Sequence, residues 1–277
     1  MTGTGTGTGP ELLPGGLANA GAVFRTGETV DRPAPPHAPA LHAQLRALRA
    51  RGFDGAPLPV AHDPARGRER LTYVPGDVAL PPFPPWAMTD ASLRSVGALL
   101  RRLHDASAFD AEARAAAWPR DMADPEGGTV LCHNDVCPEN VVFRDGRATA
   151  LIDFDLAAPG RPVWDLAMTA RYWIPMLDPH AAAHSYPPRL DVPRRLTVLA
   201  DAYGLAPADR AALPATIEET TAVCRAFVAA RLTAGDPHFI RSHAERGGWP
   251  RWDRLQTWLE DHRGEFTTAL TASRPGA

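Results

Sequence analysis

The sequence predicts an α+β fold, in which a small part with strands and one helix comes first and a larger, mainly helical part follows. Three observations support this prediction. Up to about residue 75, short apolar runs are separated by turns that contain Gly or Pro. Between residues 130 and 155, an apolar hairpin lies among polar side chains. After residue 165, apolar side chains recur at the three- and four-residue spacing of amphipathic helices.

The N-terminal part is expected to contain two pairs of strands and one helix. Residues 12–32 read as strand, Gly-rich turn and strand, with Thr26-Gly27-Glu28 as a second turn. Residues 39–51 form a predicted helix with leucines on one side and Gly52 after its last turn. The remaining strands are expected at residues 58–62 and 69–74.

The C-terminal part is expected to be built mostly from helices. The first has leucine and valine side chains on one side and ends near His104, which we interpret as a helix C-terminal cap residue. An irregular loop is expected at residues 175–188. The predicted helices are residues 92–104, 166–173, 193–203, 207–213, 216–233 and 252–270.

The polar residues around the apolar hairpin are the candidates for chemistry. His133, Asp135 and Asn140 have the spacing H-x-D-x-x-x-x-N, and the hairpin that follows leads to Asp153 and Asp155. One carboxylate can orient or deprotonate an attacking hydroxyl. An amide oxygen and a second carboxylate can hold Mg²⁺, which prefers hard oxygen ligands. This set of side chains is what magnesium-dependent phosphoryl transfer requires.

The hairpin geometry predicts that these side chains converge. Asp145-Gly146 is the favoured two-residue turn between strand-like runs, and it sets a register in which facing residue numbers sum to 291. In this register Asn140 faces Leu151. Asn140 and Asp153 then emerge at the same open end of the hairpin, and Asp135 lies on the loop just before it.

These motifs resemble those of the aminoglycoside phosphotransferase and choline kinase group of small-molecule kinases. The resemblance covers about residues 12–175 and is strongest over residues 130–168. It implies a two-lobed, protein-kinase-like fold, with an antiparallel sheet and one helix in the small lobe and a catalytic hairpin in the larger helical lobe. The full string with I-D-F-D disfavours the alternative that H-x-D belongs to an ordinary loop of a Rossmann-like fold.

The resemblance also implies a role for each residue of the motif. The loop Asp of this family is the catalytic base, which here is Asp135. The loop Asn and the Asp that opens the I-D-F-D segment bind magnesium in the family, here Asn140 and Asp153. The downstream D-L-A segment implies that Asp165 braces the catalytic loop.

The nucleotide site follows from the same resemblance. Gly15, Gly16 and Asn19 lie in the Gly-rich turn that corresponds to the nucleotide loop. Tyr73 and Val74 lie at the expected hinge between the lobes, against which the adenine is expected. The implied phosphate donor is ATP or GTP, bound with Mg²⁺.

The chain is therefore expected to have three segments. Residues 1–11 form a Thr/Gly tail that is expected to be disordered, because it has no apolar side chains to bury. Residues 12–75 form the N-terminal nucleotide-binding lobe. Residues 76–277 form the C-terminal catalytic and substrate-binding lobe.

The sequence departs from the family at the phosphate-binding lysine. All 29 basic residues are Arg, so the strand lysine of these kinases is missing. The helix that should carry its glutamate partner has His42 and Gln44 but no acid. Arg32 stands at about the lysine position and is our candidate phosphate contact, although arginine is not equivalent to lysine. The alternative is that Arg32 is a solvated residue before Pro33.

The composition limits the partners. A net charge of −3 without a basic stripe disfavours nucleic acid. No apolar run approaches the ~20 residues of a membrane span, and no signal peptide opens the chain. The three cysteines, an odd number, favour a reducing cytoplasm over a disulfide framework, and we interpret Cys132 and Cys137 as packing residues.

The substrate is expected to be a small molecule with a hydroxyl group. Residues 180–277 contain 11 acidic residues and 12 Arg, a balance that does not favour a polycation. A neutral, sugar-like or nucleoside-like antibiotic fits better, in resistance or self-protection. Two alternatives remain open: a catalytically silent nucleotide-binding protein, favoured by the missing lysine, and a metal-dependent hydrolase built on His133, Asp135, Asp153 and Asp155.

Overall fold

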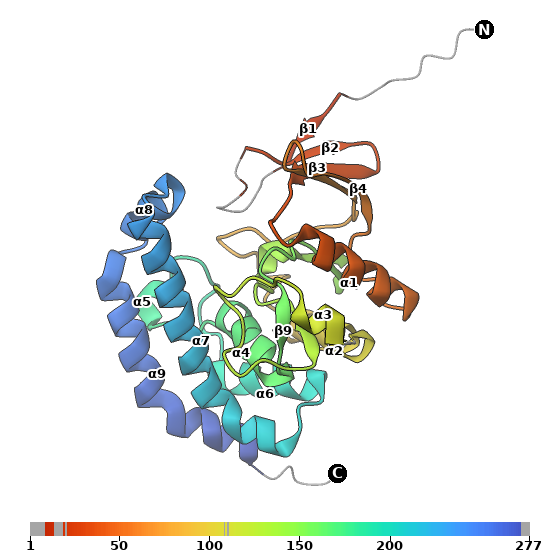
Figure 1. Cartoon of the computed structure of the whole chain (residues 1–277). Coiled ribbons are helices and arrows are strands. Elements are labelled where there is room, and N and C mark those ends of the chain that lie inside the picture. Colours follow the sequence, from red (N-terminus) through yellow and green to blue (C-terminus); the bar gives the residue numbers. More distant parts are fainter. Residues whose placement is uncertain (1–8, 14–18, 20, 108, 110, 273–277) are drawn as a thin grey trace, which may run out of the picture.

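The N-terminal part of the chain is an antiparallel sheet with one helix packed below it (Figure 1). The computed structural model describes residues 9–13, 19, 21–107, 109 and 111–272. The predicted Thr/Gly tail lies largely outside these residues. The sheet has the strand order β1-β2-β3-β5-β4. Its elements are β1 (Glu11–Leu12), β2 (Phe24–Thr26), β3 (Thr29–Pro33), α1 (Ala38–Ala50), β4 (Pro59–Asp63) and β5 (Arg68–Thr72).

The predicted N-terminal elements are present because their turn residues have the required backbone. Gly27 has φ +58° in the turn that joins β2 to β3. Gly52 has φ +85° just after α1, where a left-handed residue commonly ends a helix. Pairing of β3 with β5 places Arg32 directly opposite Glu69, although 37 residues separate them.

The C-terminal part is mainly helical, and it contains two short two-stranded sheets, β6-β9 and β7-β8. Its α and β elements confirm the predicted fold class. The elements are α2 (Asp90–Ala106), α3 (Ala111–Ala115), β6 (Val130–Cys132), the 3-10 helix η1 (Pro138–Asn140), β7 (Val141–Arg144), β8 (Arg147–Leu151), β9 (Ala158–Gly160), α4 (Pro162–Trp173), α5 (Pro179–Ala182), α6 (Val192–Tyr203), α7 (Pro207–Thr233), α8 (Pro237–Glu245) and α9 (Gly248–Thr271).

The predicted break between two helices at Pro214 is wrong. Helix α7 continues through Pro214, which is buried. Tertiary packing compensates for the missing N–H bond, because α7 packs against both α4 and α9 and buries Leu213 and Ile217 beside the proline. The predicted irregular loop at residues 175–188 contains the short helix α5, which is capped by Asp178.

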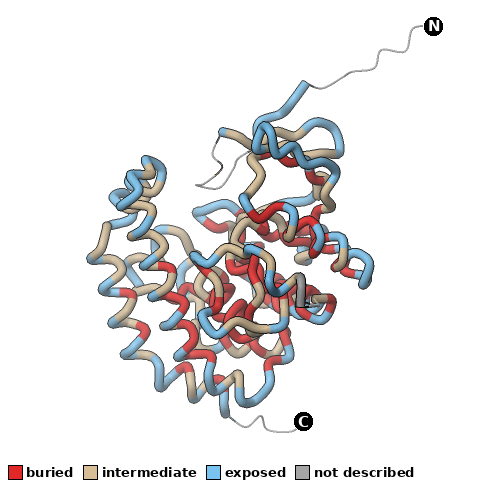
Figure 2. The backbone as a smooth tube through the Cα atoms, in the orientation of Figure 1, coloured by how far each residue is buried: buried red, intermediate tan, exposed pale blue. Residues whose placement is uncertain are grey.

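Burial concentrates in the C-terminal part (Figure 2). Helices α2, α4 and α6 bury leucine, tryptophan and alanine side chains around the β7-β8 hairpin, and α1 contributes three buried leucines to the same core. Most residues of the sheet are exposed or half-buried (Figure 2). The polar residues around the β7-β8 hairpin therefore lie on the better-packed of the two parts. The division at residues 75 and 76 stays a prediction.

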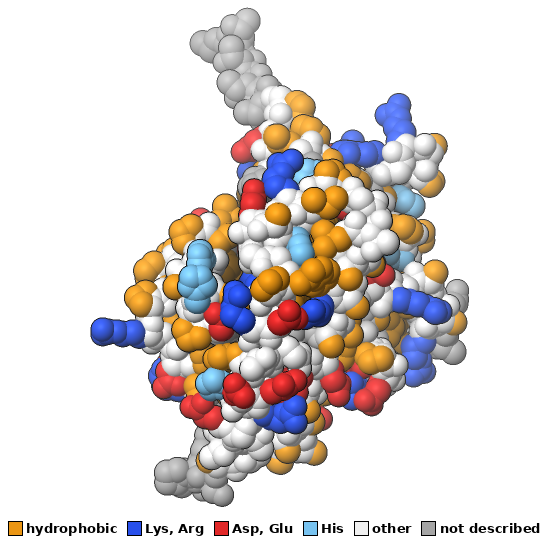
Figure 3. All heavy atoms as spheres, turned by 90° about the vertical axis from the view of Figure 1, so that its left-hand side faces the viewer, with side chains coloured by type: hydrophobic (Ala, Val, Ile, Leu, Met, Phe, Trp, Pro, Cys, Tyr) orange, Lys and Arg blue, Asp and Glu red, His pale blue; other side chains and the backbone are white. Residues whose placement is uncertain are grey.

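The surface has mixed charge on the face shown in Figure 3, where Arg, Asp and Glu side chains are interspersed. Among the described residues, no helix combines the length and apolar character needed to cross a membrane.

Candidate active site

Asp165 holds the start of the catalytic loop. It lies in the first turn of α4, fully buried, and accepts the backbone N–H groups of His133 and Asn134, both at 2.8 Å. Burial acts to raise the pKa of Asp165, but its hydrogen bond with His104 and the nearby charges lower it on balance. The bracing role predicted for Asp165 is confirmed.

The interpretation of His104 as a helix cap is wrong. Ser107 caps α2, and His104 is buried with both ring nitrogens engaged. Nε2 lies 3.0 Å from Oδ2 of Asp165, and Nδ1 lies 2.7 Å from the Tyr203 hydroxyl. His104 therefore links α6 to the carboxylate that braces the loop, a role that required the tertiary structure to see.

The loop is also tied to the end of the hairpin. Nε2 of His133 donates to the Ile152 carbonyl at 3.0 Å, and Nδ1 of His133 accepts the N–H of Asp135 at 3.3 Å. Because both ring nitrogens are used, His133 is a structural residue and a poor metal ligand. This observation opposes the hydrolase alternative. Asn134 and Asp153 both have φ +64°, and strained backbone of this kind is concentrated at functional sites.

The hairpin brings Asp153 to the loop, although the predicted register is wrong by one residue at this end. Asp145 and Gly146 have positive φ, as their predicted turn requires. A bulge between Val142 and Phe143 then shifts the pairing, so that Val141, and not Asn140, faces Leu151. The residue opposite Asn140 is Ile152, whose N–H donates to the Asn140 carbonyl at 2.9 Å. The open end still carries Asn140 and Asp153 together.

Asn140 contacts the predicted catalytic base directly. Its Nδ2 donates to Oδ2 and to the backbone carbonyl of Asp135, both at 3.0 Å. This arrangement leaves the carboxamide oxygen of Asn140 available as a ligand. Burial and the charge of Asp153 raise the pKa of Asp135 to about 7, and Tyr172 acts in the opposite direction.

Arg32 is bound to three carboxylates at once. Its guanidinium donates to Glu69 (2.7 Å), Asp153 (2.7 Å) and Asp155 (2.6 Å). Its side chain is buried, with a residue exposure of 5%. The alternative of a solvated residue before Pro33 is therefore wrong. Burial acts to lower the pKa of Arg32, but the charges of Asp155, Asp153 and Glu69 raise it on balance.

The missing ion pair of the small lobe is replaced by a different one. Glu69, on β5, pairs with Arg32, and its other oxygen lies 2.6 Å from Nε2 of His42 on α1. Burial alone raises the pKa of Glu69, but His42 and Arg32 lower it on balance. Sequence reasoning missed Glu69 and His42. The sequence feature that could have identified Glu69 is its place on a predicted strand, because that strand pairs with the strand of Arg32.

Of the residues predicted in the Gly-rich turn, Asn19 contacts a carboxylate of the site. Nδ2 of Asn19 donates to Asp155 at 3.0 Å. Burial and Asp153 raise the pKa of Asp155 to about 6, against the opposing effects of Arg32 and Asn19. Gly15 and Gly16 lie outside the described residues.

Tyr73 and Val74, which were predicted to form the hinge, do not line the cavity beside these carboxylates. The N–H of Tyr73 donates to the Glu28 carbonyl at 2.8 Å, and the guanidinium of Arg25 lies 3.7 Å from the centre of the Tyr73 ring. Their predicted contact with adenine stays a prediction.

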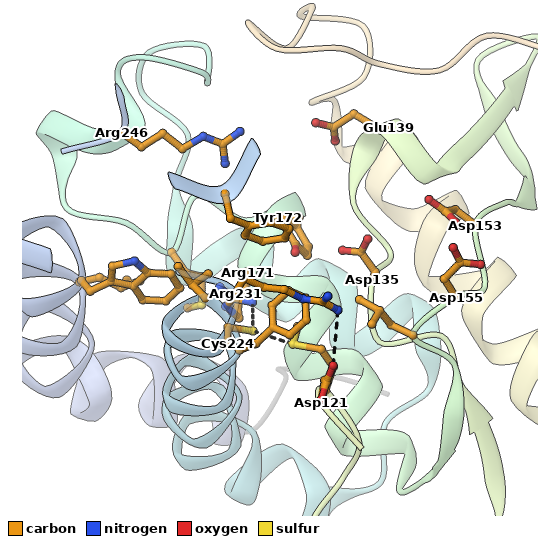
Figure 4. A pocket seen from close by; sticks show the side chains of 18 of the residues that line it. Asp121, Asp135, Glu139, Asp153, Asp155, Arg171, Tyr172, Cys224, Arg231 and Arg246 are labelled. Atoms are coloured by element: carbon orange, nitrogen blue, oxygen red, sulfur yellow. Dashed lines mark hydrogen bonds and ion pairs between the residues drawn. The ribbon is translucent and has the colours of Figure 1, made fainter. Parts of the chain in front are cut away.

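A cavity of about 1010 Å³ opens in front of the catalytic loop. Asn19 and His37 line it from the N-terminal part, and helices α4, α7 and α9 line it from the C-terminal part. Figure 4 shows the carboxylates of Asp135, Glu139, Asp153 and Asp155 on one side, with Arg171, Arg231 and Arg246 across from them. The cavity thus has one acidic and one basic side.

The donor atoms at the acidic side fit Mg²⁺. Asp153 and Asp155 supply carboxylate oxygens, and Asn140 supplies a carboxamide oxygen, which are the ligands that Mg²⁺ prefers. The carboxylate–histidine–cysteine cluster found among the described residues, Asp165, His104 and Cys132, lies in the core behind the loop. Its carboxylate already accepts three hydrogen bonds.

Comparison with known proteins identifies relatives of this chain. Residues 104–213 match the phosphotransferase enzyme family (APH). The trifolitoxin immunity protein of Rhizobium leguminosarum bv. trifolii is 35% identical over 156 residues, which cover 55% of this chain and 57% of that protein.

Solved structures share the fold across nearly the whole chain. A choline/ethanolamine kinase family protein from Mesorhizobium loti has a TM-score of 0.63 at 19% identity, covering 98% of this chain and 95% of that one. The streptomycin–ATP complex of APH(2")-IIa has a TM-score of 0.54 at 13% identity, covering 86% of this chain and 93% of that one. The predicted resemblance is confirmed: residues 104–213 match the model of the phosphotransferase enzyme family, and the chain has the fold seen in solved structures of an aminoglycoside phosphotransferase and a choline/ethanolamine kinase family protein.

Proposed function

We propose that this protein is a magnesium-dependent kinase that transfers the γ-phosphate of ATP or GTP to a hydroxyl group of a small molecule. The observation that carries the proposal is the meeting of Asp135, Asn140 and Asp153 at one end of the β7-β8 hairpin, at the edge of a cavity large enough for a nucleotide phosphate tail and a substrate.

Asp135 would receive the substrate hydroxyl. Its carboxylate faces the cavity and accepts a hydrogen bond from Asn140, so it can orient the hydroxyl and accept its proton. Asp153 and Asn140, with Asp155 beside them, would hold Mg²⁺. The bound metal supplies positive charge next to the phosphate oxygens. Positioning and charge neutralisation are the main demands of phosphoryl transfer.

Arg32 would be the cation of the small lobe that approaches the phosphates. It is anchored by Glu69 through Nε, which leaves its two terminal nitrogens directed at Asp153 and Asp155. A magnesium nucleotide that binds these carboxylates would therefore meet the Arg32 guanidinium at the same place. Arg32 is thus placed to exchange a carboxylate contact for a phosphate contact.

The proposed role is protection against an antibiotic or a toxin of low molecular weight. The 35% identity with a trifolitoxin immunity protein supports it, as does the fold shared with a kinase that binds streptomycin and ATP. The three free cysteines fit the cytoplasm, where the nucleotide donor is found, and the proposal assigns the protein to that compartment.

A transfer assay tests the proposal. The protein is incubated with Mg²⁺ and γ-labelled ATP or GTP, together with a panel of hydroxylated antibiotics and metabolites. Label is expected in one class of small molecule with the wild type and not with Asp135→Asn. Absence of both transfer and magnesium-dependent nucleotide binding would refute the proposal.

One observation favours the second candidate, a nucleotide-binding protein without transfer activity. Arg32 neutralises Asp153 and Asp155 directly, and an arginine held there competes with a metal ion. The same assay separates the two candidates, because a silent protein binds nucleotide without magnesium dependence and transfers no label.

A further inference from the structure

On the basic side of the cavity, several arginines make no ion pair with a carboxylate of the described residues. Two of its arginines have carboxylate partners: Arg231 lies 3.6 Å from Asp121, and Arg254 lies 3.7 Å from Asp178. Among the residues that the structure describes, six arginines line the cavity: Arg120, Arg171, Arg231, Arg246, Arg251 and Arg254.

Arg171, Arg246 and Arg251 form a cluster that we call the arginine wall. They come from three separate elements, namely α4, the residue that follows α8, and α9. None of the three makes an ion pair with a carboxylate of the described residues; Arg171 donates to Sγ of Cys224 instead. Glu245 also lines the cavity, but it forms no ion pair with this cluster within the described part of the chain.

Arg251 is close enough to Arg246 and Arg171 to feel the charges of both. The pKa of Arg251 is lowered, first by burial and then by the charges of Arg246 and Arg171. Like charges gathered in a half-buried cavity cost stability in the free protein, and an anion placed among them relieves that cost. The fold therefore gathers three positive charges that no carboxylate of the described residues pairs with at ion-pair distance.

The wall faces the catalytic loop. Arg171 precedes Tyr172, whose hydroxyl interacts with Asp135, and the charge of Arg171 acts to lower the pKa of Asp135. Figure 4 shows Arg246 directed across the cavity toward the side that carries Glu139 and Asp135. A molecule that reaches Asp135 with a hydroxyl group therefore has its far end beside the arginines.

We propose that the substrate carries an anionic oxygen group, such as a carboxylate, which binds to Arg171, Arg246 and Arg251 while a hydroxyl group of the same molecule lies at Asp135. Only the placement of the hydroxyl group at Asp135 rests on the proposed kinase function; the binding of the anionic group to the arginines does not. Arginine is suited to this task, because its planar fork binds carboxylate oxygens in pairs. A polycationic substrate would be repelled by the same wall.

The test uses a matched pair of probes, 4-(trifluoromethyl)benzoate and 4-(trifluoromethyl)benzamide, which differ in charge and not in shape. Binding of each is followed by fluorine NMR, with and without magnesium nucleotide. The acid is expected to bind wild-type protein at least about tenfold more tightly than the amide, since hydrogen bonds to charged groups contribute about 1.5–3 kcal/mol.

Three variants complete the experiment. The double variant Arg246→Gln/Arg251→Gln is expected to lose the preference for the acid, and Arg251→Lys to keep part of it. Arg263→Gln is the matched control, because Arg263 lies on the same helix α9 and pairs with Glu218 outside the cavity.

Equal binding of acid and amide to the wild type, or an unchanged preference in the double variant, overturns the inference. Failure of the kinase proposal gives a different experimental result. It appears as the absence of magnesium-dependent nucleotide binding, while the preference for the acid over the amide remains measurable in nucleotide-free protein.

Discussion

Asp135 lies on the loop whose start Asp165 holds, and the surroundings of the two carboxylates differ. Asp165 is fully buried and accepts hydrogen bonds from two backbone N–H groups and from His104. Asp135 accepts a bond from Asn140 and faces the carboxylate of Asp153. The pKa of Asp165 is lowered by its donors, and burial and Asp153 raise that of Asp135 to about 7. The donors around each carboxylate separate the structural residue, Asp165, from the proposed catalytic residue, Asp135.

The largest expected effect is the loss of transfer in Asp135→Asn. Removing the carboxylate leaves the substrate hydroxyl without an acceptor for its proton, so the rate of transfer should fall by ~10²–10⁴. The melting temperature should stay the same or rise, because the raised pKa means that the charged form is disfavoured in the fold. The same substitution at the exposed turn, Asp145→Asn, is the control and should leave the rate unchanged. Near wild-type turnover in Asp135→Asn contradicts the assignment.

In contrast to Asp135→Asn, the main expected effect of Asp165→Asn is a loss of stability. The carboxylate of Asp165 accepts three hydrogen bonds with its two oxygens. An amide has one oxygen and one NH₂ group, so the NH₂ group would face one of these donors and leave it without an acceptor. Leaving a buried donor unsatisfied costs about 1–3 kcal/mol of unfolding free energy. Denaturant unfolding measures this, with Asp105→Asn, an exposed partner of Arg101, as a control expected to change stability by less than about 0.5 kcal/mol. If Asp165→Asn behaves like its control, the comparison between the two carboxylates fails.

Arg32→Ala is expected to raise the nucleotide KM about ten- to a hundredfold, because a charge-assisted hydrogen bond to phosphate contributes about 1.5–3 kcal/mol. The substrate KM should change little. Arg32→Lys serves as a second variant that keeps a charge opposite Glu69, and Arg70→Gln, an exposed neighbour on β5, serves as the control. An unchanged nucleotide KM in a folded Arg32→Ala protein would move the phosphate contact to another group.

The smallest expected effect is a difference in pH dependence, measured on metal-free protein. The folded pKa of Asp165 lies below its unfolded value, so its contribution to stability is present above about pH 4 and is lost as the pH falls further. The folded pKa of Asp135 lies above its unfolded value, so stability falls as the pH rises from about 4 through about 7. Asp135→Asn should therefore gain stability over the wild type across that range. If the free energy of unfolding changes with pH in the same way in the wild type and in Asp135→Asn, the raised pKa of Asp135 is contradicted.

The sequence predicts the catalytic loop well because the signals there are local. The spacing of Asp135 and Asn140, and the turn at Asp145-Gly146, depend on neighbours within a few residues. The register of the hairpin failed at its open end because nothing in the sequence marks the bulge beside Phe143.

The anchors of Arg32 and Asp165 could not be predicted in the same way. Glu69 reaches Arg32 through the pairing of β3 with β5, and His104 reaches Asp165 across 61 residues. Contacts at such separations depend on how whole elements pack, and no spacing rule describes them. The missing lysine was visible in the sequence, whereas the Arg32–Glu69 pair that replaces it was not.

Calorimetric titration of ATP and GTP into the protein, with and without Mg²⁺, measures the proposed metal–nucleotide site most directly. Tight binding is expected only with Mg²⁺. The loss of affinity should be large in Asp153→Ala and smaller in Asn140→Ala, because the first removes a charged ligand and the second a neutral one. Asp135→Asn should bind the nucleotide as the wild type does. Equal affinity with and without Mg²⁺ in the wild type would contradict the claim that Asn140 and Asp153 form a metal–nucleotide site.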